Sequence, residues 1–495
     1  MIVLVAALTL ATPQLGWRAG TPEPILEDDP EFVELYWRCW EAYYAAVRED
    51  VRLALFPARY VAPNEEIAPE TIAVVTLYSK WGWKAAPCAE TLSFVAQRVD
   101  PKGILPARIP VATGEPEGEA AGPPLLPLAL YDLFRVSGDR RLLETCFSPF
   151  VRRQAYLESL YRHTTSEPER DPETGAILID PKTREPKMKT TSGPRFVPPA
   201  FSLSPAGPGP GIVASTEAIS YSMIATSALA ACAEALGLKD SARLYQRLLR
   251  EDAALLATLY HEDFGMPVGR DAQGEPAEQP TLVTTWALVG GAASTQTADQ
   301  LAAALADRDL FSRRLSWPLL PQKHSLYSGA SGVKPWLVYL TARGLMDAGK
   351  RDRAAYAVEA MLRTMARNGG SDGTVYSDYG PDTAKPAPES YPDPIRGGAL
   401  AIAGLIEAVL GFETDAEHNT VDWHLWRRDR HGLKNLRFGE ATVSLLADAR
   451  ASRLSLPKIQ VVADRSFTLR LHVGGKTFVR KFPAGSSIWD LTIDR

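Results

Sequence analysis

Aromatic rings beside charged side chains are the first feature of this chain that could do chemistry. The stretch YSKWGWKAAPCAETL at 78–92 places Trp81 and Trp83 on either side of a glycine, with Lys84 directly after them. Such flat rings can stack on a ligand, because each offers an apolar face and leaves the polar groups at its edges free. Trp336 is a further candidate. We expect these residues to line a pocket, although large aromatic residues also fill protein cores.

Carboxylates in two polar loops could supply acid–base chemistry. Glu217 opens a helical run after the first loop, and Asp378 lies in TVYSDYGPD at 374–382, beside Ser377 and Tyr379. An inverting glycosidase needs two carboxyl groups roughly 6.5–9.5 Å apart, one protonated and one ionised. The second loop holds three further acids, Asp372, Glu389 and Asp393. Each of these carboxylates could also be a solvated loop residue or a helix cap.

The residue patterns of several other reactions are missing. The seven histidines form no HxH or HExxH, and the four cysteines form no CxxC, so we expect no metal site. There is no GxSxG and no P-loop, and we expect no cofactor. A net charge of −5 gives no electrostatic footprint for nucleic acid. The cysteines lie in apolar helical runs and are expected to be small buried residues, with a disulfide left open; they are Cys39, Cys88, Cys146 and Cys232.

Helical periodicity dominates the chain up to about residue 410. Apolar residues recur at helical spacing from Phe32 to Val47, after an Asp29-Pro30 start. Three glycines, each at the end of one helical run and shortly before the next, indicate antiparallel helix pairs; they are Gly138, Gly237 and Gly349. Further runs lie near 84–98, 123–136, 140–162, 213–236, 239–260, 278–289, 294–306, 332–347, 351–367 and 395–410. About eleven helices result, close to the twelve of a six-hairpin α/α toroid.

Two long loops and a change of period divide the rest of the chain. Residues 163–211 and 368–394 are polar and rich in Pro and Gly, and both could lie over one end of a helical ring. From residue 421 apolar and polar residues alternate, and a Gly-Gly pair at 474–475 is typical of the turn of a β-hairpin. We therefore predict a mainly α fold: an (α/α)6 toroid or barrel over 25–415, followed by a small antiparallel β module over 416–495. No oligomeric state follows from the sequence.

The N-terminus resembles a secretory signal. Residues 2–11, IVLVAALTLA, are apolar but too short to span a bilayer, and no Lys or Arg precedes them. We treat 1–20 as a candidate signal peptide and expect a secreted or periplasmic protein. No other segment is expected to span a membrane.

The order of several segments is similar to that of the mannosylglycerate hydrolase-like branch of glycoside hydrolase family 63. DPEFVELYWRCWEAYY resembles the opening helix of that family, and SKWGWKAAPCAETLSFVAQRVDPKGILPARI resembles the stretch that carries a Trp-Asp pair. AGPPLLPLALYDLFRVSGDRRLLE, TVYSDYGPD, IAGLIEAVLGFETD and WHLWRRDRHGLKNLRFGEATVSLL follow in the family's order over about 29–490. The resemblance implies a six-hairpin α/α barrel that cleaves α-glycosidic bonds with inversion, and a carbohydrate ligand.

This chain departs from the family at the positions where the family carries its acids. Lys84 follows the tryptophan where the family has Asp, and the general-acid motif reads SGPR at 192–195, without an acidic residue. Ala214 stands where the family has an Asp near the start of the next helix, and Ser377 stands at the position of the family's catalytic base. Because a positioned acid or base is typically worth about 10²–10⁴-fold in rate, losing both would bring the family's chemistry close to background.

Three hypotheses follow. In the first, the protein is a glycoside hydrolase with displaced carboxyl groups, in which Asp378 is the base and Glu217 or a loop acid is the proton donor. In the second, it is a non-catalytic carbohydrate-binding pseudoenzyme. The third is a polysaccharide lyase on a similar toroid. In that reaction Tyr379 or His324 would abstract a proton, and Lys84 and Arg195 would neutralise the carboxylate of a uronate.

Arg195 and Lys84 also indicate an anionic ligand such as an acidic glycoside, because cations stand where the family has acids. All of these hypotheses expect Lys84, Arg195 and Ser377 to converge on one hollow, bounded by indole rings.

Overall fold

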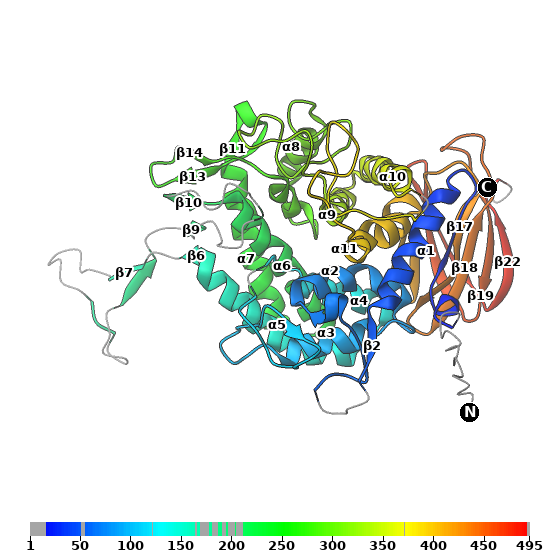
Figure 1. Ribbon diagram of the computed structural model, residues 1–495, viewed down its shortest axis with the longest axis horizontal. Helices are drawn as coiled ribbons and strands as arrows, with labels where there is room; N and C mark the ends of the chain where they lie inside the picture. Colours follow the sequence, from blue (N-terminus) through cyan, green and yellow to red (C-terminus); the bar gives the residue numbers. More distant parts are fainter. Residues whose placement is uncertain are drawn as a thin grey trace, which may run out of the picture.

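The computed structural model describes residues 16–50, 55–120, 122–163, 166–168, 178–180, 187–190, 195–196, 203, 211–370 and 372–492. Most of the candidate signal peptide and residues 192–194 of the SGPR motif lie outside these ranges. Helices are the dominant element of the described residues up to Val409, and strands follow, stacked at one side of the helices in orange and red (Figure 1). The mainly α fold with a β-rich C-terminal region is therefore as predicted.

The helices other than α2 begin and end close to the predicted positions. The helices are α1 (Pro30–Ala45), α2 (Pro69–Ser79), α3 (Cys88–Gln97), α4 (Leu126–Ser137), α5 (Arg140–Tyr161), α6 (Thr216–Leu236), α7 (Lys239–Thr258), η6 (Leu282–Leu288), α8 (Thr295–Ala306), α9 (Pro335–Asp347), α10 (Arg351–Asn368), α11 (Pro394–Gly398) and η7 (Ala399–Val409), which directly continues α11. The glycines predicted to end helices have positive φ, 68° at Gly138, 74° at Gly237 and 75° at Gly349. Asp139 caps α5, because its carboxylate accepts a hydrogen bond from the Leu142 amide.

Helix α2 is the element that the sequence did not reveal. Nine of its eleven residues are buried, so it lacks the polar stripe from which an amphipathic helix is recognised. Its start carries the remaining signals, Pro69 at the first position and Glu70 in the first turn. Because α2 ends at Ser79, the stretch 80–84 follows the end of a helix.

Every second helix along the chain packs beside the next one in this series, with the first residues of all of them at one end and the last residues at the other. Neighbour contacts run from α2 to α4, α6, η6, α9 and η7, and η7 contacts α2 again. At one end lie the first residues of these helices: the Thr216 and Thr284 hydroxyls are 3.1 Å apart, and Arg396 donates to Thr71. We call this the loop end. At the opposite end lie their last residues, where Arg140 donates to the carbonyls of 235–236 and the Gly290 amide to Asp347.

The C-terminal strands form two sheets that lie at this opposite end, which we call the β end. The strands are β15 (Phe412–Asp415), β16 (Thr420–His424), β17 (His431–Phe438), β18 (Ala441–Ala447), β19 (Lys458–Ala463), β20 (Phe467–Val473), β21 (Lys476–Phe482) and β22 (Gly485–Asp490). One sheet has the order β15-β16-β20-β21; the other has β17-β18-β19-β22 and gains β1 (Glu23–Leu26) at its edge. The amides of Ala416 and Gly439 bond to carbonyls in the last turn of α4.

Two expectations about the β region need correction. The strands are not all antiparallel, since β16 and β20 pair in parallel, and the region is not confined to 416–495, since β1 comes from the N-terminal part of the chain. The Gly474-Gly475 turn joins β20 to β21 as predicted, with positive φ at both glycines.

Shorter strands lie along the loops between helices. They are β2 (Val47–Glu49), β3 (Arg59–Val61), β4 (Glu66–Ile67), β5 (Ile109–Pro110), β6 (Arg162–His163), β7 (Ser166–Pro168), β8 (Met188–Thr190), β9 (Arg195–Phe196), β10 (Ile212–Ala214), β11 (Tyr260–His261), β12 (Met266–Pro267), β13 (Gly269–Asp271) and β14 (Pro276–Glu278). Helix α6 is long and apolar enough to cross a membrane by composition, but 72% of its apolar window is buried inside the protein. The four cysteines are buried and unpaired, as expected of small core residues.

Candidate functional site

The tryptophan stretch that suggested a pocket lies at the β end. Trp81 is 2% exposed, and its indole Nε1 donates to Glu407 at 3.1 Å. Trp83 is half-buried against the C-terminal sheet, and its Nε1 lies 3.4 Å from the Arg437 carbonyl in β17. Lys84 is exposed, with its Nζ 5.2 Å from the centre of the Trp83 ring. Trp81 is thus a core residue, and Trp83 and Lys84 belong to the contact between helices and strands.

The predicted convergence of Lys84 with Ser377 is wrong. Ser377 lies in the loop before α11, where its backbone and side chain bond to Tyr391 at the loop end. Helix α2 lies between the two positions, because it starts at the loop end and delivers residues 80–84 to the β end. Since α2 was not predicted, residues 78–84 were assigned to the wrong end of the helices.

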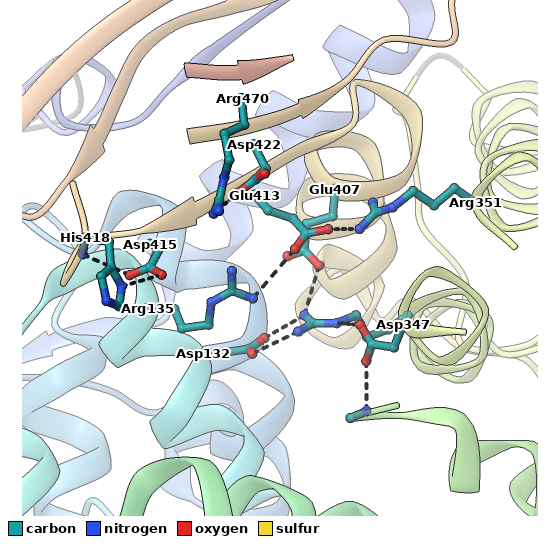
Figure 2. Close-up of polar contacts among 12 residues, drawn as sticks. Asp132, Arg135, Asp347, Arg351, Glu407, Glu413, Asp415, His418, Asp422 and Arg470 are labelled. Atoms are coloured by element: carbon teal, nitrogen blue, oxygen red, sulfur yellow. Dashed lines mark hydrogen bonds and ion pairs between the residues drawn. The ribbon is translucent and has the colours of Figure 1, made fainter. Parts of the chain in front are cut away.

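A buried ionic cluster lies beneath the tryptophans at the β end. Lys80 Nζ lies 2.6 Å from Asp132 Oδ2 and 2.9 Å from Glu407 Oε1, and Arg343 contacts the same two carboxylates at 3.1 and 3.4 Å. Figure 2 shows Asp132 and Glu407 facing each other across this cluster. Burial would raise the pKa of Asp132, but Arg343 and Lys80 outweigh it and lower the pKa to about 2. The sequence signal for this cluster was the presence of charges inside apolar helical runs, most clearly Glu407 as the one charge in ALAIAGLIEAV.

Glu217 lies in the first turn of α6 at the loop end and is fully engaged. Its side chain is 2% exposed, and Oε1 accepts hydrogen bonds from the Leu203 amide and the Tyr221 hydroxyl, both at 2.7 Å. Burial and the Glu217 carboxylate raise the pKa of Tyr221 well above its ordinary value, so Tyr221 stays a donor. This geometry holds the Glu217 carboxyl group away from solvent.

Aromatic rings lead from Glu217 to the start of α9. The Tyr221 and Trp286 ring centres are 6.0 Å apart, and the Trp286 and Trp336 centres are 5.9 Å apart. Trp336 is half-buried in the first turn of α9, two residues after Lys334. The structure thus places Glu217 and Trp336 at the same end.

Asp378 lies beside the start of α9 as well. Its Oδ1 accepts the Gly332 amide at 2.8 Å, and Oδ2 lies 3.6 Å from Lys334 Nζ. The side chain is 16% exposed, which leaves it more accessible than Glu217. Asp378 therefore has a structural role in the loop and keeps a partly open edge.

Tyr379 is a core residue, not a wall of a pocket. It is fully buried, its backbone pairs with Val333, and its hydroxyl accepts the Tyr376 amide at 3.1 Å. Burial raises the pKa of Tyr379, which disfavours the phenolate that a lyase base would need.

The other residues of the lyase hypothesis are not brought together. His324 is 7% exposed, its Nδ1 accepts the Leu326 amide, and burial lowers its pKa. Lys84 is at the β end. Arg195 begins β9, whose partner β10 leads into α6, but its side chain lies outside the described residues.

A pocket of about 420 Å³ lies at the loop end, between the end of α1 and the starts of α2 and α11. Tyr391 is 54% exposed on its wall, beside Asp393 and Arg396. Arg396 Nη2 donates to the Thr71 hydroxyl at 3.3 Å, and Asp393 Oδ1 accepts the Arg396 amide at 3.0 Å. An exposed ring beside a fixed guanidinium and carboxylate suits a polar ligand with a flat apolar face.

Sequence reasoning named Asp393 as a loop acid but missed Tyr391 and Arg396. The signal that could have found them is the tyrosine between the Ser and Pro residues directly before the Pro394 helix start.

A comparison with protein families matches part of this chain. The model of the mannosylglycerate hydrolase MGH1-like glycoside hydrolase domain matches residues 206–391, which include Glu217, Trp336, Asp378 and Tyr391 and exclude the stretch at 78–84. No curated protein matches the chain in sequence.

Solved structures share the fold at low sequence identity. The family 63 mannosylglycerate hydrolase of Thermus thermophilus, in complex with glucose, is 16% identical with a TM-score of 0.53, over 74% of this chain and 98% of that one. The α-L-rhamnosidase of Dictyoglumus thermophilum is 11% identical with a TM-score of 0.58, over 94% of this chain and 50% of that one. The family 78 rhamnosidase of Bacillus sp. GL1 is 12% identical with a TM-score of 0.56, over 86% of this chain and 40% of that one.

The match to the Dictyoglumus structure leaves 6% of this chain uncovered. The β region is larger than that share of the chain, so the match includes part of the β region. Residues 206–391 are similar to a glycoside hydrolase domain model, and the chain resembles the mannosylglycerate hydrolase-like branch of glycoside hydrolase family 63.

Proposed function

We propose that the protein binds a carbohydrate at its loop end and that the family's catalysis has been lost. The observation that carries the proposal is the loop-end pocket, in which the exposed Tyr391 ring stands beside Asp393 and Arg396. A sugar presents one apolar face to a ring and hydroxyl groups at its rim, which a carboxylate and a guanidinium can bind. The glycoside hydrolase-like domain match, which ends at Tyr391, supports the same class of ligand.

We also infer that the helices form the six-hairpin α/α toroid expected from the sequence. In support, α2, α4, α6, η6, α9 and η7 contact one another in order, and η7 returns to α2. Helices α1, α3, α5, α7, α8 and α10 precede these six in turn along the chain. In this arrangement the loop end is one mouth of the ring.

Binding is favoured over hydrolysis because of how the two candidate carboxylates are held. Inversion requires one carboxyl group to be protonated and both to flank the scissile bond. Glu217 is buried, and its Oε1 accepts hydrogen bonds from the Leu203 amide and the Tyr221 hydroxyl, both at 2.7 Å, so this oxygen is already occupied by partners within the protein. Asp378 accepts the Gly332 amide and faces Lys334.

The test is a binding panel of glucose, mannose and glucuronate, measured by calorimetry. Because Tyr391 is exposed, Tyr391→Ala should fold normally and weaken binding about tenfold or more, from the loss of ring stacking. Tyr356→Ala is the matched control, since Tyr356 is 74% exposed on α10, away from the pocket. If none of the three sugars bound, or both variants bound like the wild type, the proposal would be wrong.

Hydrolysis is the second candidate, and the partial exposure of Asp378, which lies beside Lys334 at the start of α9, favours it. Asp378 would act as the base and Glu217, once released from Leu203, as the proton donor. Turnover of nitrophenyl α-glycosides that falls at least about 100-fold in Asp378→Asn would support it. Asn keeps the acceptor for the Gly332 amide, so this variant separates chemistry from loop structure. Glu389→Gln, an exposed carboxylate in the same loop, is the control.

A further inference from the structure

A second pocket of about 420 Å³ lies at the β end, in the seam between the helices and the strands. Its wall comes from the start of α10, the end of η7, β16, the β20–β21 turn and the loop that leads into β19. We call it the seam pocket. It is separate from the loop-end pocket, with which it shares no lining residue. Pockets between structural units are preferred positions for ligands.

Cationic side chains reach the seam pocket from three elements. Arg351, at the start of α10, is half-buried and held by an ion pair with Glu413, which also pairs with Arg135 (Figure 2). Burial lowers the pKa of Arg351 to about 10, so it remains charged at neutral pH. Arg453 lies 4.8 Å over the ring of Trp426, and exposed Lys476 follows the Gly474-Gly475 turn.

The negative charge in the seam pocket is smaller. Glu407 lines the pocket but already binds Lys80, Arg343, the Tyr339 hydroxyl and the Trp81 indole. Asp352, in the first turn of α10, is the remaining lining carboxylate. Glu413 partly neutralises Arg351. Arg453 and Lys476 have no ion pair with any described residue, so the lining has two unpaired cations and, besides Glu407, one carboxylate, Asp352.

Two stacked imidazoles complete the pocket wall. The His424 and His472 rings are 4.1 Å apart at an angle of 6°. His472 uses both ring nitrogens, one with Asp422 and one with Thr477, each at 3.0 Å. No hydrogen bond joins the ring of His424 to any residue that the structure describes. The pKa of His424 is lowered to about 3, chiefly by burial and also by Arg351 and His472, which together lower it by more than Asp422 raises it. The ring is therefore neutral and carries one N–H.

We propose that the seam pocket binds a small anion carrying a carboxylate or phosphate group, with Arg453 and Lys476 at the rim, Arg351 on the wall and His424 as a hydrogen-bond donor. Charge-assisted hydrogen bonds from arginine and lysine are the usual way in which proteins hold such groups. The proposal does not rest on the loop-end site.

Calorimetric titration with inorganic phosphate and with glucuronate tests the proposal, against glucose and against sodium chloride at equal ionic strength. Phosphate, glucuronate or both should bind the wild type, and Lys476→Gln and Arg453→Gln should each weaken that binding at least about fivefold. Lys481→Gln, an exposed lysine on the same strand as Lys476, should leave it unchanged. The stronger of the two anions identifies the ligand group. The proposal would be overturned if neither anion bound, or if all variants bound the anions equally. It would also be overturned if glucose bound with the same affinity as the anions and the same two variants weakened that binding.

The protonation of His424 gives a second readout that does not depend on a variant. A bound anion next to the ring favours the imidazolium form, so the pKa of His424 should rise when phosphate or glucuronate saturates the site. The ring signals can be followed by NMR against pH and assigned with His424→Gln. A pKa of His424 that stays the same with and without saturating anion would contradict a site at this position.

Discussion

At the residue scale, charged side chains are fixed by partners from distant helices, and this decides what they can do. Glu217 bonds to Tyr221 and Leu203, Asp378 to Gly332, and Glu407 to a buried cluster. A carboxyl oxygen that already accepts a hydrogen bond from the protein is less available to a substrate. The residue types for glycoside hydrolysis were visible in the sequence, but their partners were not.

Breaking the buried ionic cluster should be strongly destabilising. Asp132 is 2% exposed and pairs with Lys80 and Arg343. Asp132→Ala leaves two buried cations short of a partner, and we expect a loss of about 3–5 kcal/mol in the free energy of unfolding, measured in urea. Glu144→Ala, which removes an exposed i,i+4 pair with Arg140, should change it by less than about 0.5 kcal/mol. A small effect of Asp132→Ala would contradict the assigned contacts.

Asp252 should make stability depend on pH. Its carboxylate is fully buried, 2.7 Å from the Ser222 hydroxyl and 3.2 Å from Arg162, and burial raises its pKa to about 7 despite Arg162. Because the folded pKa exceeds the unfolded one, the stabilising contribution is fully present below about pH 4 and is lost as the pH rises through about 7.

The measurement for Asp252 compares the wild type with Asp252→Asn by urea unfolding at several pH values. Asn stays neutral, so the variant should gain stability relative to the wild type by about 2–4 kcal/mol between pH 4 and pH 8. A difference between the two proteins that does not change with pH would show that Asp252 ionises normally.

At the element scale, the sequence predicted the α-helices of ten or more residues other than α2. It missed α2, nine of whose eleven residues are buried, so that no polar face marks it as a helix. That single omission reversed the position of Trp83 and Lys84, because residues at the end of a helix lie at the opposite end from residues at its start.

Helix capping offers a matched test at this scale. The Asp139 carboxylate accepts the Leu142 amide at 3.0 Å and caps α5. Asp240 follows Gly237 in a similar stretch of sequence, but it is the second residue of α7, whose N-cap is Leu238, and its side chain is exposed beside Arg243. Asp139→Ala should therefore cost about 1 kcal/mol in urea unfolding, and Asp240→Ala less than about 0.5 kcal/mol. Equal losses would contradict this difference in capping.

At the scale of the whole molecule, ion pairs join the two parts of the protein. Arg427, 7% exposed and just after β16, pairs with Asp29 at 2.7 Å and with Glu359 of α10. Asp29 was predicted only as a helix cap; its carboxylate instead bridges Arg427 and Arg363. Such contacts between residues far apart in sequence could not be predicted from local patterns.

The helices and the β region should therefore unfold together. We expect one calorimetric transition for the wild type, because β1 and Arg427 tie the N-terminal part of the chain to the C-terminal sheet. Arg427→Met leaves Asp29 and Glu359 without their buried cation and should lower the midpoint by several degrees. Two separate transitions in the wild type would contradict a shared folding unit.

Hydrogen exchange of the protein with and without bound sugar tests the central claim, a carbohydrate site at the loop end, most directly. With glucose, mannose or glucuronate at saturating concentration, the account predicts slower amide exchange in 59–72 and 386–397, which border the loop-end pocket, and no change in 78–85. Slower exchange in 78–85 alone would place the sugar at the β end and contradict the account.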